Sequence, residues 1–118
     1  MPVVVYALPG CSSCRNAVDW LKAHGVSFQE RHIRRDPPNR QELADLAAQL
    51  ADGAEGLLSR RSLRFRELGL AGQELQGEAL LDLLAREPHL LRRPILHDGS
   101  RTVVGFDRPG LADLAGVR

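Results

Sequence analysis

Residues 2–14 of the chain read PVVVYALPGCSSC, and this stretch decides the fold class. Its first half, 2–7, is β-branched and apolar, which is typical of a buried strand. A Pro-Gly pair ends that strand, and Cys11 and Cys14 follow it in CxxC spacing. The helix predicted over 12–23 therefore begins directly behind a buried strand, with a cysteine at its start.

The segment after the cysteines completes a strand–helix–strand unit. Gly25 is a typical C-terminal stop for the helix over 12–23. Alternating apolar residues over 26–33 predict a second strand. Because a helix connects the two strands, we expect them to run parallel, with a right-handed crossover.

The rest of the chain predicts a helical stretch, then two strands and a closing helix. Pro37 and Pro38 end the first unit, and Asn39 with Glu42 forms the capping box of a helix that runs to residue 51. The further predicted elements are, in chain order, short helices within 56–69, a helix over 78–85, strands at 95–96 and 102–106 around an Asp98-Gly99 turn, and a helix over 109–116.

The predicted order is thus β-α-β, a helical insert at about 39–91, and β-β-α. This is the order of the thioredoxin-like fold, an α/β architecture with a mixed, roughly four-stranded sheet. We predict one such domain over residues 1–118. Pro94 begins the third strand, where a cis peptide bond would bring backbone close to Cys11, and the sequence leaves the isomer open.

Composition limits which binding partners and which cellular compartment we expect for this chain. A chain of 118 residues is the size of one domain, and a net charge of +1 favours neither nucleic acid nor a membrane surface. No segment approaches the ~20 apolar residues of a membrane span, and the first residues do not form a signal peptide. Two cysteines three apart are not a secreted disulfide framework. We therefore expect a cytoplasmic protein.

Cys11 is the predicted centre of the chemistry. The amides and the positive end of the helix dipole favour a thiolate there, which is the nucleophilic and oxidisable form. The same amides form a cradle for an oxyanion. Ser12, Ser13 and Arg15 lie in the first turn and are predicted to help bind an anionic substrate.

Cys14 lies one helical turn further and could attack an intermediate on Cys11 to close a disulfide. The alternative is half of a zinc site, but zinc usually takes four ligands. The four histidines are scattered, and the sequence has no second CxxC. We predict redox chemistry for the pair and no bound metal.

Arginines form the second component of the predicted site. Arg60 and Arg61 lie in the insert, and Arg92 and Arg93 precede Pro94. A solvated surface is the usual environment of arginine and suits most of the others. Arg93 differs, because in this fold its proline neighbour places it beside the nucleophile.

In combination these residues resemble the arsenate reductase (ArsC)/Spx family, over almost the whole chain. The resemblance rests on residues 6–16 (YALPGCSSCRN), 37–43 (PPNRQEL), Arg61 with 67–70 (ELGL), 90–95 (LLRRPI) and the Gly105-Phe106 pair.

The resemblance to glutaredoxin-linked arsenate reductases implies our main functional prediction. In it, Cys11 attacks arsenate, while Arg61 (or its neighbour Arg60), Arg93 and Arg108 bind the oxyanion. Arsenite is released when a second thiol, Cys14 or glutathione, takes Cys11 as a disulfide. Glutaredoxin or thioredoxin supplies the reducing equivalents, and no bound cofactor is required.

Two features depart from the reductases. Their histidine just upstream of the cysteine is replaced by Ala7 and Leu8, and they usually lack a counterpart of Cys14. An intramolecular disulfide reduced by thioredoxin would then replace recycling by glutathione. A glutathione-dependent role without arsenate is a further possibility within the family.

The alternative function implied by the resemblance is that of Spx, a redox-switched regulator that binds RNA polymerase through the C-terminal domain of the polymerase α-subunit. Cys11 and Cys14 match its switch, Arg93 matches the arginine that pairs with the oxidised or anionic cysteine, and Gly53 matches a glycine at the polymerase surface. Gly53 is equally well explained as a helix C-cap.

Overall fold

The computed structural model describes residues 2–116, and their contacts divide the chain into two compact units. The first unit combines the residues up to Asp36 with those from Arg93 onward, and the second is Pro37–Arg92. The prediction of a single domain over the whole chain remains a prediction.

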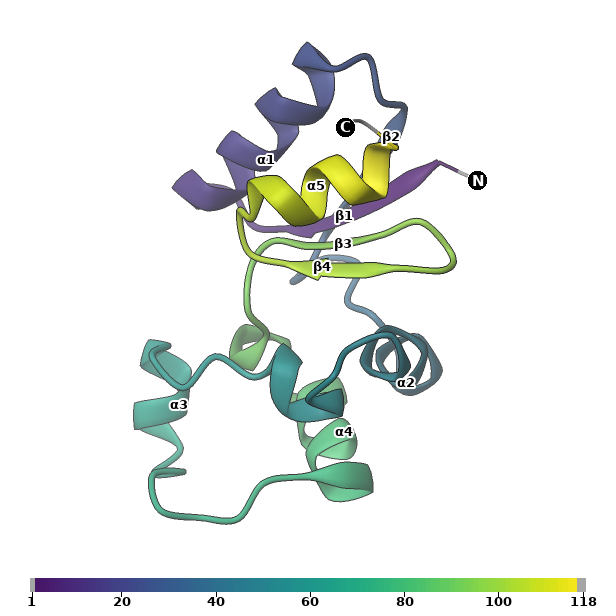
Figure 1. Cartoon of the computed structure of the whole chain (residues 1–118). Coiled ribbons are helices and arrows are strands. Elements are labelled where there is room, and N and C mark those ends of the chain that lie inside the picture. The colour runs from purple at the N-terminus through teal and green to yellow at the C-terminus, as the bar shows by residue number, and fades with distance from the viewer. Residues whose placement is uncertain (1, 117–118) are drawn as a thin grey trace. The chain divides into compact units, whose positions relative to one another are not determined.

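The first unit contains a four-stranded sheet and two helices (Figure 1). Its elements are, in chain order, β1 (Val3–Ala7), α1 (Ser12–Ala23), β2 (Phe28–His32), β3 (Ile95–His97), β4 (Thr102–Val104) and α5 (Arg108–Ala115). The strand order is β2-β1-β3-β4, with β1 and β2 parallel and the other neighbours antiparallel. The predicted α/β fold with a mixed four-stranded sheet is confirmed.

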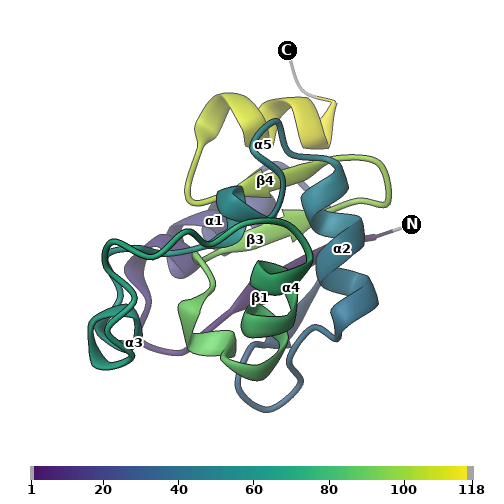
Figure 2. The same cartoon turned by 90° about the horizontal axis from the view of Figure 1, so that it is seen from below.

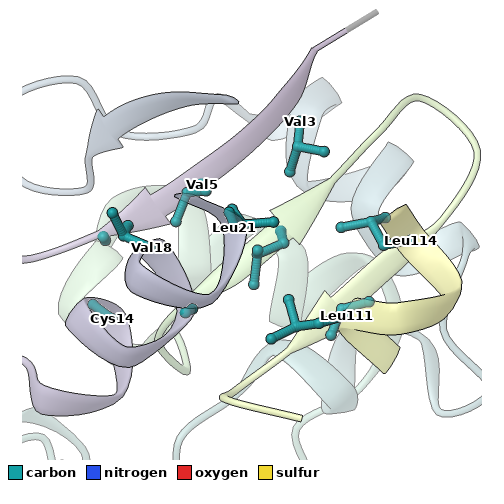
Figure 3. Packing of buried hydrophobic residues seen from close by; sticks show 11 residues of the cluster. Val3, Val5, Cys14, Val18, Leu21, Leu111 and Leu114 are labelled. Atoms are coloured by element: carbon teal, nitrogen blue, oxygen red, sulfur yellow. The ribbon is translucent and has the colours of Figure 1, made fainter. Parts of the chain in front are cut away.

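One face of this sheet is buried under α1 and α5, which contact each other. Alternate residues of β1, namely Val3, Val5 and Ala7, join residues of both helices in one hydrophobic cluster. Figure 3 shows Leu21 of α1 and Leu111 of α5 among its members. This packing holds α1 against β1, in agreement with the predicted buried strand followed by a helix.

The second unit is helical. Its elements are α2 (Arg40–Ala48), the 3₁₀ helix η1 (Gly53–Leu57), α3 (Leu63–Glu67), α4 (Gly77–Arg86) and the 3₁₀ helix η2 (Pro88–Leu90). Helices α2 and α4 contact each other (Figure 2). Arg40 joins them through ion pairs with Glu78 and, at 2.8 Å, with Asp82.

Several predicted boundaries shift for local reasons. The second strand starts at Phe28 instead of residue 26, because Val26 N donates to Leu21 O at the end of α1. Helix α2 ends at Ala48 instead of residue 51, since Gln49 and Leu50 make tighter 3₁₀-type bonds. Gly53 is therefore not the C-cap of α2 and instead opens η1.

Candidate functional site

Cys11 lies where β1 passes into α1. It is the N-cap of the helix, with extended backbone angles, and its Sγ accepts the Cys14 backbone N–H at 3.2 Å. Gly10 precedes it with φ +78°, a conformation that a side chain would strain. The sulfur of the half-buried Cys11 thus accepts a hydrogen bond from one of the backbone N–H groups that have no partner within the helix.

Cys14 differs from Cys11 in its surroundings. It is only 4% exposed and belongs to the hydrophobic cluster under α1 (Figure 3). Burial raises the pKa of its thiol to about 12, and a hydrogen bond to Cys11 and the charge of that neighbour act in the same direction. Both cysteines are free in this structure. Cys14 is therefore a protonated thiol at neutral pH, held next to a more accessible sulfur.

Arg93 lies near this pair. The Arg93–Pro94 peptide bond is cis, and Gly105 N donates to Pro94 O at 2.8 Å. The Arg93 charge lowers the pKa of Cys14, against the larger effect of burial. The structure thus brings together Cys11, Cys14 and Arg93, three of the residues that the sequence predicts for the site.

A pocket of about 460 Å³ opens beside Cys11, between α1 and β2. Its lining includes Leu8, Pro9 and Cys11, together with the predicted substrate-binding residue Arg15. The remaining polar lining comprises Asp19 and Lys22 of α1 and Glu30, Arg31 and His32 of β2. The pocket lies along β2, which is an edge strand of the sheet.

His32 is a site residue that the sequence analysis did not select. Its Nδ1 accepts backbone N–H groups of Arg34 and Arg35, both at 3.2 Å, so the proton of the neutral ring is on Nε2. His32 pairs in register with Ala7, the last residue of β1. The signal in the sequence was its position at the carboxyl end of a strand expected to run parallel to β1.

The other predicted residues fall into two groups. Ser12 and Ser13 begin α1, and Arg108 begins α5 with its guanidinium 5.7 Å from the Phe106 ring. Arg60 and Arg61 belong to the second unit, where Arg60 lies 5.9 Å from the Phe65 ring. Only the first group shares a compact unit with Cys11.

Within residues 2–116, no group of three or more His, Cys, Asp or Glu side chains could hold a metal ion. No helix in the same part of the chain is long and apolar enough to cross a membrane.

The chain is similar to known proteins both in sequence and in structure. The model of the ArsC family matches residues 6–113. The regulatory protein MgsR of Bacillus subtilis is 42% identical over 105 residues, which cover 89% of this chain and 82% of MgsR. The global transcriptional regulator Spx of Streptococcus pyogenes is 41% identical over 105 residues, which cover 89% of this chain and 78% of Spx. An arsenate reductase from Vibrio cholerae superposes with a TM-score of 0.81 at 26% identity, over 100% of this chain and 98% of that one.

Proposed function

Because this chain belongs to the ArsC family, we propose that it is a redox-switched transcriptional regulator of the Spx and MgsR type. The observation that carries this proposal is the identity of 42% to MgsR and 41% to Spx, each over 89% of this chain. The comparisons therefore favour the alternative reading of the sequence over the reductase that the sequence analysis placed first.

The cysteine pair has the properties that such a switch needs. Cys11 is accessible and meets the oxidant, while Cys14 is buried one turn further along α1. Oxidation removes two electrons and two protons from the two thiols and joins them in a disulfide. Since Cys14 belongs to the cluster that holds α1 on the sheet, the new bond acts directly on the packing of that helix.

Arg93 supports the switch electrostatically. Its positive charge favours the ionised form of the nearby Cys14, the form that attacks an oxidised Cys11. In this proposal Arg93 also stabilises negative charge on Cys11 before the disulfide closes. A thioredoxin-type dithiol then returns the switch to its reduced state.

The proposed partner is RNA polymerase, bound through the C-terminal domain of its α-subunit, with Gly53 at the contact. Gly53 has φ +61° and lies at the start of η1, and a Cβ added there meets no atom within 4 Å. A side chain at this position would therefore project into open space, where it would obstruct a partner that approaches closely.

Binding of the purified chain to the isolated polymerase domain tests this partner. Gly53→Gln should weaken binding at least about tenfold, because the side chain enters the interface. Gly69→Gln is the matched control, since Gly69 has φ +64° and equally open surroundings in the same unit. Absence of binding by the unmodified chain, or equal loss in the two variants, would contradict the proposal.

A second test separates the redox switch from the partner. Transcription by a reconstituted polymerase should depend on diamide treatment of the unmodified chain, while Cys14→Ser should remove this dependence and preserve binding to the polymerase domain. If Cys14→Ser responds to diamide as the unmodified chain does, the disulfide is not the switch.

Arsenate reductase remains the second candidate function. It is supported by the superposition on the Vibrio cholerae enzyme and by a cysteine at a helix N-terminus, where an oxyanion is stabilised. Arsenate-dependent NADPH oxidation, measured with the thioredoxin system and with glutathione plus glutaredoxin, tests it directly. Turnover that is lost in Cys11→Ser would establish the enzyme, and no turnover in either system would exclude it.

A further inference from the structure

Apart from Arg31, which pairs with Asp36 at 3.2 Å, four charged side chains line the pocket beside Cys11 and are not used by the cysteine switch. Arg15, Asp19 and Lys22 come from α1, and Glu30 comes from β2. All four are exposed, and none of them forms an ion pair with a residue in the described range 2–116. These two cations and two carboxylates thus line one cavity without neutralising each other.

Secondary structure fixes how these charges are spaced. The three residues of α1 repeat at intervals of four and three, so they lie on one face of the helix. At 1.5 Å per residue, Arg15, Asp19 and Lys22 lie about 6, 12 and 16 Å along the axis from Cys11. Glu30 pairs in register with Val5, so its side chain lies on the face of the sheet that carries α1.

A ligand that matches this lining must carry both positive and negative groups. To react with Cys11, which is among the residues that line the pocket, it must also present an electrophilic atom. The disulfide of an amino-acid thiol meets both requirements, since each half has an ammonium and a carboxylate group about three bonds from the sulfur. A volume of about 460 Å³ lies within the range that holds small ligands.

We propose that the pocket between α1 and β2 binds disulfides of amino-acid thiols, with cystine as the simplest example, and presents them to Cys11 as the oxidant. Arg15 and Lys22 pair with the carboxylates, while Asp19 and Glu30 pair with the ammonium groups. The inference rests on the proposed redox switch and names the chemical class of its oxidant.

The reaction proceeds by two thiol–disulfide exchanges. Cys11 loses its proton to water, its thiolate attacks one ligand sulfur, the ligand S–S bond breaks, and the other half leaves as a thiolate that takes a proton from water. Cys14 then loses its proton to water and attacks the Cys11 sulfur, which closes the protein disulfide and releases the second half as a thiolate that also takes a proton from water. One ligand disulfide is reduced to two thiols, and two protein thiols become one disulfide.

The test uses the whole reduced chain and three symmetric disulfides that differ in charge. Cystamine carries only ammonium groups, 3,3′-dithiodipropionate carries only carboxylates, and bis(2-hydroxyethyl) disulfide is uncharged. The rate of reaction at Cys11 is followed by acid quenching and mass spectrometry of the adduct and of the protein disulfide.

The variants should change the reaction rates of the three disulfides differently. Asp19→Asn combined with Glu30→Gln should slow the cystamine reaction about fivefold, and Lys22→Gln should slow the dithiodipropionate reaction about threefold, as expected for exposed ion pairs. The uncharged disulfide should react at an unchanged rate in both. Asp113→Asn removes an exposed carboxylate of α5, outside the pocket, and should change none of the rates.

Equal effects on all three disulfides, or no effect on the charged ones, would overturn the proposal. So would an Asp113→Asn effect as large as that of the pocket variants, because the selectivity would then come from net charge alone. No polymerase is present in this assay, so a failure here is distinguishable from a failure of the proposed polymerase partner.

Discussion

The two cysteines show how far three residues of separation can change the chemistry of one side chain. Cys11 is a half-buried N-cap whose sulfur accepts a backbone N–H, whereas Cys14 is buried among apolar side chains. A thiolate is stabilised by amides and disfavoured by burial. The order of events therefore follows from position: Cys11 reacts first, and Cys14 closes the disulfide.

Alkylation should reveal this order. In the reduced folded chain at about pH 8, iodoacetamide should modify Cys11 at least about tenfold faster than Cys14, because burial keeps Cys14 as a thiol. Timed quenching and peptide mass spectrometry measure both rates. The preference should disappear in denaturant, and equal labelling of the folded chain would contradict the structure.

The raised pKa of Cys14 also predicts how stability depends on pH. The folded pKa rises from 9.0 to about 12, so the unfolded chain releases this proton first as pH increases. The stabilisation that depends on a protonated Cys14 is fully present below about pH 9, and it is lost as pH rises towards about 12. Urea unfolding of the reduced chain at about pH 8 and about pH 11 measures the loss.

Cys14→Ala is the control for this pH dependence. The variant should be less stable than the unmodified chain at about pH 8, because it leaves a gap in the cluster. The difference between the two should shrink as pH rises, because only the unmodified chain must keep a buried thiol protonated. A constant difference would show that Cys14 ionises equally well in both states.

At the scale of elements, the starts of α1 and α2 were the features that the local sequence predicted best. The capping box of α2 is present, with Glu42 N donating to Asn39 Oδ1 at 2.8 Å and Asn39 N donating to Glu42 Oε1 at 3.0 Å. Helix α1 spans Ser12–Ala23, the range that its spacing indicates. Both signals depend on neighbouring residues alone, so they can be recognised without knowledge of the packing.

Loss of the α2 cap gives a test at this scale. Asn39→Ala should lower the free energy of unfolding by about 1 kcal/mol, because the side-chain partner of the Glu42 backbone N–H is lost. Asn16→Ala, at an exposed position inside α1, makes the same chemical change without removing a cap and should be near neutral. Chemical denaturation measures both, and equal values would show that the capping box contributes nothing.

At the scale of the whole molecule, stability depends on side chains that the sheet brings together from both ends of the chain. Leu111 is fully buried in the cluster with Val5 and Leu21, although about ninety residues or more separate it from them. Eleven buried residues of the first unit form this one cluster, and four of them come from the C-terminal part of the chain.

Truncation of Leu111 should therefore be costly. Leu111→Ala should lower the free energy of unfolding by about 2–5 kcal/mol, because it creates a cavity in this cluster. Leu63→Ala is the control, since Leu63 is 63% exposed on α3 and its truncation leaves no cavity. A near-neutral Leu111→Ala in thermal or urea unfolding would contradict the packing of α5 on the sheet.

Sequence identity over most of the chain also changed which of the two predicted functions is proposed first. A cysteine at a helix N-terminus followed by an arginine before proline suits both a reductase and a redox switch, and the sequence alone favoured the reductase. The identity of about 41% to regulators over 89% of the chain is a property of the whole molecule, and it shifts the proposal to the regulator.

The sequence by itself determined the strand–turn–CxxC–helix unit, the parallel second strand and the α2 cap, because each depends on residues close together in the chain. The tertiary structure alone decided that Glu30 and His32 join Arg15 around a pocket beside Cys11. It also decided that Arg93 shares a compact unit with Cys11 while Arg60 and Arg61 belong to the other. The physical reason is that strand register and the burial of distant apolar side chains place these groups, and neither is encoded in local spacing.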